Sequence, residues 1–263
     1  MSRLQFPEDI WKYKESVWKR KLKQIREAEL NSYEVIVNSF DENEMGRGAW
    51  HIGPVSLCNR STKDKAQRGK QPAVDEHKCL RWLDPRKPHS VIYICFGSTG
   101  KAIGPQLNEI AMALEASEQA FIWVVKNQDC HLPPGFEQRM EGKGLIIKGW
   151  APQVLILEHE PIGAFVMHCG WNSTLESISA GKPMVTWPYY NEKLVTQILK
   201  NGVPKKCSKT FTTDYLVKQE TIEKALRNIM MGDGAKEMRH GAKSLKEWHG
   251  RQSTKGVHEF ITL

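Results

Sequence analysis

The sequence lacks long apolar runs, paired cysteines and a recognisable secretion signal. No stretch approaches the roughly eighteen uninterrupted apolar residues of a membrane span, and residues 1–21 are charged, without an apolar signal core. The six cysteines contain no C-x-x-C pair and no histidine at zinc-ligand spacing. We therefore predict a cytoplasmic protein with no membrane association, no disulfide framework and no metal ion.

Composition excludes fibrous, disordered and miniprotein classes. The chain has 263 residues, of which 40% are hydrophobic and 26% charged, enough for one large globular domain or two small ones. The net charge of +8 favours acidic partners, but the basic residues are spread over 12–26, 60–70 and 236–255. Such runs are typical of solvated faces, so we do not expect binding to nucleic acid.

Apolar runs that alternate with helical segments indicate the fold class from residue 90 onward. The expected strands are 91–96, 121–125, 144–147, 164–167 and 183–186. The expected helices are 105–117, 153–158, 172–180, 192–200, 218–230 and 235–249. This alternation predicts an α/β fold with a doubly wound parallel sheet, in which ligands bind at the carboxyl ends of the strands.

The chain before residue 90 has a different character. An amphipathic helix over 13–30 leads into a short strand at 35–38, and a polar segment over 41–88 contains one short helix at 75–83. A connection of this length normally joins two domains.

The first candidate for chemistry is the sequence FGSTG at 96–100, which follows an expected strand. Its glycines and Ser98 could approach a phosphate, although a plain strand-to-helix turn is the interpretation we favour. The glycine fingerprint G-x-G-x-x-G is absent, which disfavours a dehydrogenase.

The second candidate, MHCGWNST at 167–174, is richer. It places His168, Gly170, Asn172 and Ser173 where a strand ends and a helix begins, an arrangement that suits a phosphate group. One helical turn after Asn172, Glu176 could accept hydrogen bonds from a ribose diol.

A tryptophan lies upstream of this candidate. Trp150 precedes a turn and could stack on a base. Trp150 and Trp171 could instead belong to the core, and His168 could be a buried histidine. Taken together, however, these residues favour a nucleotide site.

At these residues the sequence resembles a known family. WAPQ at 150–153, HCGWNS at 168–173, Glu176, GKPM at 181–184 and WP at 187–188 resemble the plant signature box of UDP-dependent glycosyltransferases of small molecules. The branch that acts on phenolic compounds such as coumarins and flavonoids is the most similar. The resemblance implies two Rossmann-like domains in the GT-B arrangement and inverting, metal-free transfer, with no cofactor besides the donor sugar nucleotide.

The resemblance also implies a role for each matching residue. Trp150 would stack on uracil, and the Ala151 backbone would read its edge. Gln153 and Glu176 would hold the ribose, and Trp171 would contact a sugar hydroxyl. The diphosphate would be held by the turn at Gly170 together with Ser98, His168, Asn172 and Ser173.

The match is incomplete in two places. We expect residues 1–45 to be the remnant of an acceptor domain, 46–89 a linker and 90–263 the nucleotide-sugar domain, so that the family's general-base histidine and its aspartate partner are absent. His51 lies in the linker and is not expected to replace the base. Glu192 and Lys193 either occupy the family's sugar-gripping positions or follow a short deletion of them, and we favour the deletion.

Two functions are compatible with these residues. The chain is either a UDP-glycosyltransferase that transfers a hexosyl group, by family habit glucosyl, to a small phenolic hydroxyl, or a catalytically dead module that binds UDP or a UDP-sugar. A truncated chain is expected to have little activity, since a missing general base typically costs about 10²- to 10⁴-fold in rate. Acceptor, sugar and oligomeric state are left open.

Overall fold

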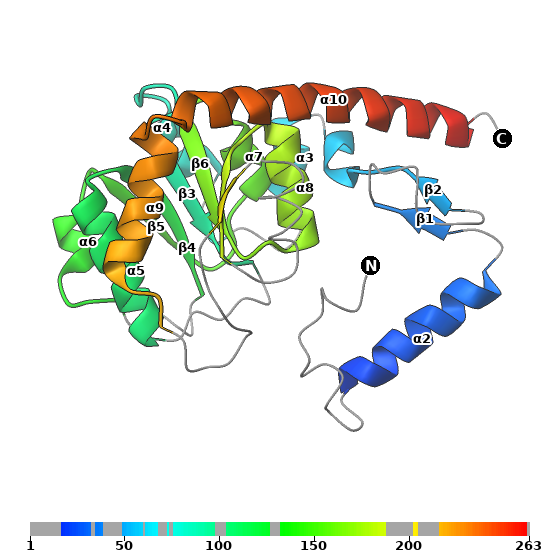
Figure 1. Ribbon diagram of the computed structural model, residues 1–263, viewed down its shortest axis with the longest axis horizontal. Coiled ribbons are helices and arrows are strands. Elements are labelled where there is room, and N and C mark those ends of the chain that lie inside the picture. The colour runs from blue at the N-terminus through cyan, green and yellow to red at the C-terminus, as the bar shows by residue number, and fades with distance from the viewer. Residues whose placement is uncertain are drawn as a thin grey trace.

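The computed structural model describes residues 17–32, 35–38, 49–59, 61–67, 73, 76–97, 104–126, 132–187, 202–204 and 216–261. Within this part of the chain, six parallel strands form one sheet in the order β5-β4-β3-β6-β7-β8. The chain starts near the middle of the sheet, winds outward to one edge and then returns to wind toward the other (Figure 1). The predicted doubly wound α/β sheet is confirmed.

Four of the strands are buried on both faces, as their continuous apolar sequences predict: β3 (Val91–Cys95), β4 (Ala120–Val125), β6 (Ile162–Met167) and β7 (Met184–Thr186). The strand β5 (Gly144–Lys148) lies at one edge of the sheet and buries only Leu145 and Ile147, on one face. All five expected strands are therefore confirmed to within a few residues. The sixth strand, β8 (Gly202–Pro204), was not predicted, because three residues that include Gly and Pro carry no strand signal.

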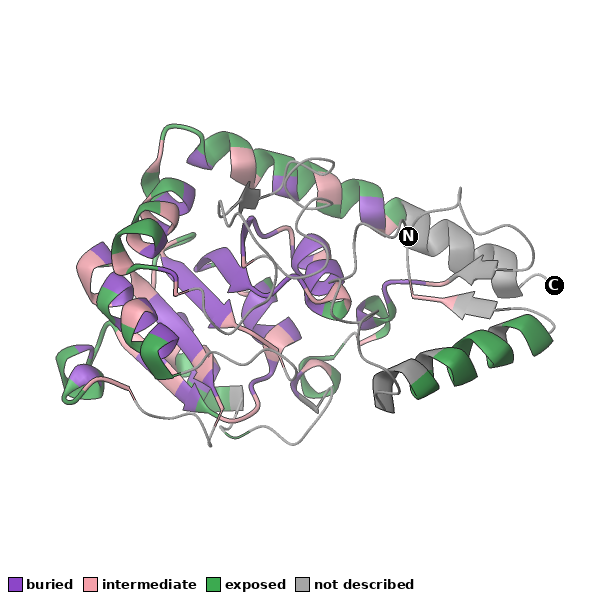
Figure 2. Cartoon of the chain, turned by 60° about the horizontal axis from the view of Figure 1, so that its bottom comes forward, coloured by how far each residue is buried: buried purple, intermediate pink, exposed green. Residues whose placement is uncertain are grey.

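Helices cover both faces of the sheet. One face packs against α5 (Gly104–Ser117) and α9 (Gln219–Met231), and the other against α4 (Glu76–Leu83), α7 (Gln153–Glu158) and α8 (Trp171–Ala180). Alternate residues of β3 serve the two faces: Ile92 and Ile94 join the first core cluster, whereas Tyr93 joins the second. Figure 2 shows the buried strands between these helical layers.

The remaining C-terminal helices frame this body. A short helix, α6 (Phe136–Arg139), occurs in the connection from β4 to β5. The last helix, α10 (Ala235–Ile261), runs along α8 and extends beyond the sheet (Figure 1). It is longer than the expected 235–249, because the residues after 249 lack the apolar periodicity that marks a helix in sequence.

The N-terminal part forms a separate small layer. Here α2 (Val17–Asn31) precedes β1 (Val35–Val37), which pairs in parallel with β2 (Ala49–His51). A 3₁₀ turn at Val55–Cys58 and α3 (Thr62–Gln67) lead to α4. The predicted early helix and strand are confirmed where they are described, whereas β2 was not predicted.

The domain boundaries at 45 and 89 stay a prediction. Within the expected linker, α4 contributes the buried residues Cys79 and Leu83 to the core beneath the sheet. Ser98, Glu192, Lys193 and the helix expected at 192–200 lie outside the described residues. No helix in the described part of the chain is long and apolar enough to span a bilayer.

Candidate nucleotide site

The strand order places a crevice at the carboxyl ends of β3 and β6. The connection that leaves β3 runs to β4 on one side, whereas the connection that leaves β6 runs to β7 on the other side. The neighbouring strands β3 and β6 therefore form the switch point where open α/β sheets bind ligands. Gly97 lies just after β3, and His168 and Gly170 just after β6. Most of the site residues predicted from sequence gather at this edge.

The imidazole of His168 packs against two glycine backbones through its Cε1 and Nε2 atoms. A Cβ added at Gly97 would stand 2.4 Å from His168 Cε1, and one added at Gly170 would stand 2.5 Å from Nε2. Gly97 also has a φ of +65°, which disfavours any side chain. The two glycines therefore hold the ring in place and bring it close to the main chain.

His168 is neutral at pH 7. Burial, reinforced by the positive charge of Lys126, lowers its pKa to about 4. A neutral imidazole has one N–H donor and one acceptor nitrogen. It can therefore contact a phosphate oxygen without itself carrying a buried positive charge.

The two buried histidines should make the fold less stable in mild acid. Burial also lowers the pKa of His249 on α10 to about 4, whereas an unfolded histidine titrates near about 6.5. Below about pH 6.5 the unfolded chain takes up protons that the folded chain excludes, so stability falls as the pH drops toward about 4. We expect the titration of His168 to lower the free energy of unfolding by about 2 kcal/mol between about pH 7 and pH 5, and that of His249 to lower it further.

Urea unfolding at the two pH values measures this effect. The variant His249→Leu should reduce the pH dependence, because it removes one of the two buried histidines whose pKa is lowered. Equal stability of the unmodified protein at both pH values would contradict the assignment.

The N-terminus of α8 supplies backbone donors next to His168. Gly170 is the N-cap residue, and the first amide bonded within the helix is that of Thr174, which donates to Gly170 O at 2.9 Å. The amides of Trp171, Asn172 and Ser173 precede it in the first turn. These N–H groups and the helix dipole together favour an anion at this point.

A hydrogen-bonded carboxylate lies one turn further along α8. Gln153 Nε2 donates to Glu176 Oε2 at 2.7 Å and to Ser173 Oγ at 3.2 Å. The hydroxyl of Tyr93 donates to Gln153 Oε1 at 3.4 Å, which orients the amide with its NH₂ group toward α8. This role of Tyr93 was not predicted from the sequence; the only signal was a hydroxyl within an otherwise aliphatic strand.

Trp150 and Ala151 lie at the carboxyl end of β5. The carbonyl of Trp150 accepts from Ala73 N at 2.7 Å, and the half-buried ring follows Gly149, whose φ is +128°. Ala151 is buried, and its carbonyl accepts from Gln153 N at 2.8 Å. The turn thus joins the predicted uracil residues directly to the predicted ribose residue Gln153.

Trp171 contacts the N-terminal layer in this structure. Its indole N–H donates to Asn38 O at 2.7 Å, so a contact with a sugar hydroxyl would have to use its backbone N–H. The side chain of Asn38 donates to Asn172 Oδ1 at 3.4 Å and accepts from Val55 N at 3.0 Å. Asn38 was not predicted near the site, although a polar residue directly after a strand was a usable signal.

Comparisons with known proteins agree with this geometry. Residues 68–249 match the family model described as UDP-glucoronosyl and UDP-glucosyl transferase. The chain is 50% identical to a scopoletin glucosyltransferase of Nicotiana tabacum, over 95% of this chain and 56% of that protein. It is 51% identical to UDP-glucose flavonoid 3-O-glucosyltransferase 7 of Fragaria ananassa, over 95% and 57%. It thus spans just over half the length of these relatives.

Solved structures show the same likeness. UGT73P12 of Glycyrrhiza uralensis, complexed with glycyrrhetinic acid 3-O-monoglucuronide, superposes with a TM-score of 0.84 at 37% identity, covering 100% of this chain and 59% of that one. UGT2 of Phytolacca americana, complexed with UDP-2fluoro-glucose and pterostilbene, gives 0.77 at 29% identity, covering 98% and 59%. With its sheet order, its crevice and these matches, the chain belongs to the UDP-glucoronosyl and UDP-glucosyl transferase family.

Proposed function

We propose that this chain binds a UDP-sugar at the carboxyl edge of β3 and β6 and is the donor-binding part of a UDP-glycosyltransferase. The observation that carries the proposal is the group formed by Gln153, Ser173 and Glu176 one turn from the N-terminus of α8. It joins a carboxylate suited to a ribose diol with a helix end suited to a diphosphate.

The same groups suit the chemistry of transfer. When the sugar leaves, the bond between its anomeric carbon and the diphosphate oxygen breaks, and negative charge grows on the UDP leaving group. Amides of the first turn of α8 and the N–H of His168 would stabilise that charge. Because these donors stabilise the charge of the diphosphate, we propose that UDP binding and transfer need no metal ion; added EDTA should leave UDP affinity unchanged.

The acceptor class is proposed from the relatives. Their names include scopoletin, flavonoid and anthocyanin glucosyltransferases. We therefore propose inverting transfer of a hexose, by the habit of these relatives glucose, to a hydroxyl of a small phenolic compound. A cytoplasmic location, expected from the sequence, is part of the same proposal and is tested by cell fractionation.

Titration calorimetry tests donor binding. We expect saturable binding of one UDP per chain, weaker binding of UMP and still weaker binding of uridine, because each phosphate lost removes contacts with α8 and His168. Absence of binding heat at millimolar UDP would refute the proposal.

Transfer is measured separately, because the chain spans just over half of its relatives. UDP-glucose is incubated with scopoletin or a flavonoid, and product is compared with that formed by the variant Glu176→Ala. Product above this control supports transfer by these 263 residues, whereas UDP binding without product supports the alternative of a binding module.

A further inference from the structure

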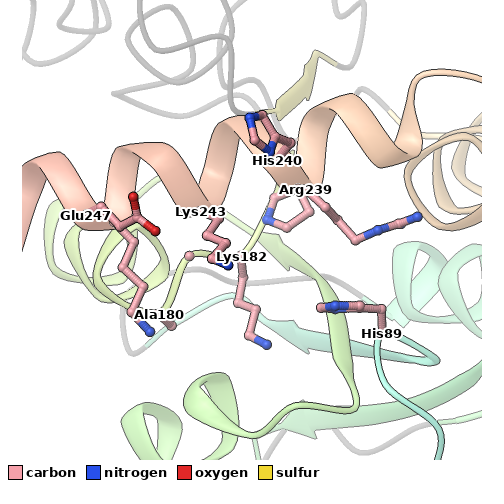
Figure 3. A pocket seen from close by; sticks show the side chains of 10 residues that line it. His89, Ala180, Lys182, Arg239, His240, Lys243 and Glu247 are labelled. Carbon is pink, nitrogen blue, oxygen red and sulfur yellow. The ribbon is translucent and has the colours of Figure 1, made fainter.

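A hollow of about 400 Å³ lies at the amino ends of the strands, across the sheet from the nucleotide site at their carboxyl ends. Its lining comes from the loop before β3, the loop between α8 and β7, and α10 (Figure 3). These loops enter the amino ends of their strands, whereas the nucleotide site lies at the carboxyl ends. We call this feature the basic hollow; its charged and titratable lining includes His89, Lys182, Arg239, Lys243, Lys246 and Glu247.

The α10 side of the basic hollow is a column of positive charge. Arg239, Lys243 and Lys246 occupy successive turns of one helix face, with Glu247 as the carboxylate among the lining residues. Like charges at a spacing of four residues, such as Arg239 and Lys243, oppose helix formation. Figure 3 shows the side chain of Lys243 pointing from α10 toward the loop that carries Lys182.

Lys182 brings a buried cation to the same place. It is only 6% exposed, and its ammonium group donates to His159 O at 3.0 Å and Ile162 O at 2.9 Å. Burial and then the charge of Lys246 lower the pKa of Lys182 to about 8, with Glu160 acting in the opposite direction. The lysine is therefore still mostly charged at pH 7, within a positive field that Glu160 only partly offsets.

His89, in the loop before β3, lies in the same positive field. Burial lowers the pKa of His89, as do the charges of Lys182 and Arg239, whereas a backbone contact with Ile162 and the charge of Glu160 raise it. Residues from three separate segments thus share one positive potential around a concave space. The side chain of Lys246 packs against the loop that carries Lys182, because a Cβ added at Gly181 would meet the Lys246 Cδ at 3.1 Å.

We propose that the basic hollow binds a small polyvalent oxyanion, of the class of inorganic pyrophosphate and phosphorylated small molecules. Its four Lys and Arg side chains outnumber its one carboxylate. Lys182 and Arg239 also donate to backbone carbonyls, so the ammonium groups of Lys243 and Lys246 would be the main donors to phosphate oxygens, within the positive field of the other two. Its volume falls at the lower end of the roughly 300–1,000 Å³ of small-molecule sites. A concave site with a buried cation suits a compact anion, whereas nucleic acid requires an extended basic surface.

This site is distinct from the nucleotide site. The two lie at opposite ends of α8: the phosphate-binding turn begins at Gly170, and the helix ends at Gly181 beside Lys182. UDP and an anion in the basic hollow should therefore bind together without competing.

Calorimetry with pyrophosphate, in the presence of saturating UDP at constant ionic strength, tests the proposal. We expect saturable binding that the double variant Lys243→Gln/Lys246→Gln weakens at least about tenfold. Both lysines are exposed, so the double variant should fold. If it does not fold, the single variant Lys246→Gln is measured in its place. Lys224→Gln removes one charge at an exposed position on α9, as Lys246→Gln does in the hollow, and should leave pyrophosphate affinity within about twofold. UDP affinity should be unchanged in all three variants.

Several results would overturn the proposal. They are the absence of saturable pyrophosphate binding, equal affinity in the double variant and Lys224→Gln, and equally tight binding of chloride at the same ionic strength. Binding of an oligonucleotide but not of pyrophosphate would point to an extended basic surface instead. If UDP itself fails to bind, the lysine variants still test the basic hollow, so the two proposals fail independently.

Discussion

Replacing Glu176 by alanine is expected to lower the affinity for UDP by about 100-fold, or about 3 kcal/mol. Without the carboxylate, the ribose diol would lose its two proposed hydrogen bonds. Gln153 would also lose the partner that its Nε2 contacts at 2.7 Å. Hydrogen bonds to a charged group are worth about 1.5–3 kcal/mol each, so two of them account for this loss. Calorimetry of the variant against the unmodified protein gives the number directly.

The ligand provides the sharper control for this prediction. The 2′-deoxy form of UDP should bind the unmodified protein more weakly than UDP, and Glu176→Ala should remove most of that difference. Glu220→Ala, at an exposed position on α9, should change neither affinity. If Glu176→Ala still discriminates fully between the two nucleotides, the carboxylate does not hold the ribose.

Gly97→Ala is expected to destabilise the fold by several kcal/mol and to abolish UDP binding. An alanine at this position would have to adopt a φ of +65°, which costs about 1–2 kcal/mol, and its methyl group would stand 2.4 Å from the His168 ring. The ring has little room to move aside, because the backbone of Gly170 also approaches its Cε1 and Nε2 atoms. Chemical denaturation followed by UDP titration measures both effects.

Three other glycines separate the two causes of this loss. Gly142 has a φ of +77° with open space around its Cβ position, so Gly142→Ala reports the backbone cost alone. Gly170 has a φ of −63° but the same clash with His168, so Gly170→Ala reports the steric cost alone. Gly104→Ala has neither penalty and should be neutral or stabilising. A Gly97→Ala variant no less stable than Gly142→Ala would show that the His168 ring can yield.

Much of the fold could be predicted from the sequence because the central strands are buried on both faces. Runs such as 91–96 and 164–167 leave no alternative to a covered parallel sheet. The strands β2 and β8 escaped prediction for the opposite reason. Each has three residues, and each is defined by the strand it pairs with rather than by its own sequence.

The candidate site divides in the same way. Asn172 and Glu176 lie four residues apart on α8, so helical geometry places them together, and His168 lies only two residues before the N-cap Gly170. Tyr93 and Asn38 are 60 and 134 residues from their partners Gln153 and Asn172, and only the folded chain brings them into contact. Local patterns therefore identified the groups suited to a ligand, but not the residues that orient them.

The bonds made by Asn38 have a mechanical consequence. This residue follows β1 directly and touches both Trp171 and Asn172, so the small N-terminal sheet is anchored to the turn proposed to receive the diphosphate. A shift of that sheet would pull on the turn, and a ligand that stiffens the turn would in exchange restrain the sheet. Ligand binding at the turn is thereby expected to reduce the motion of the small sheet that contacts it.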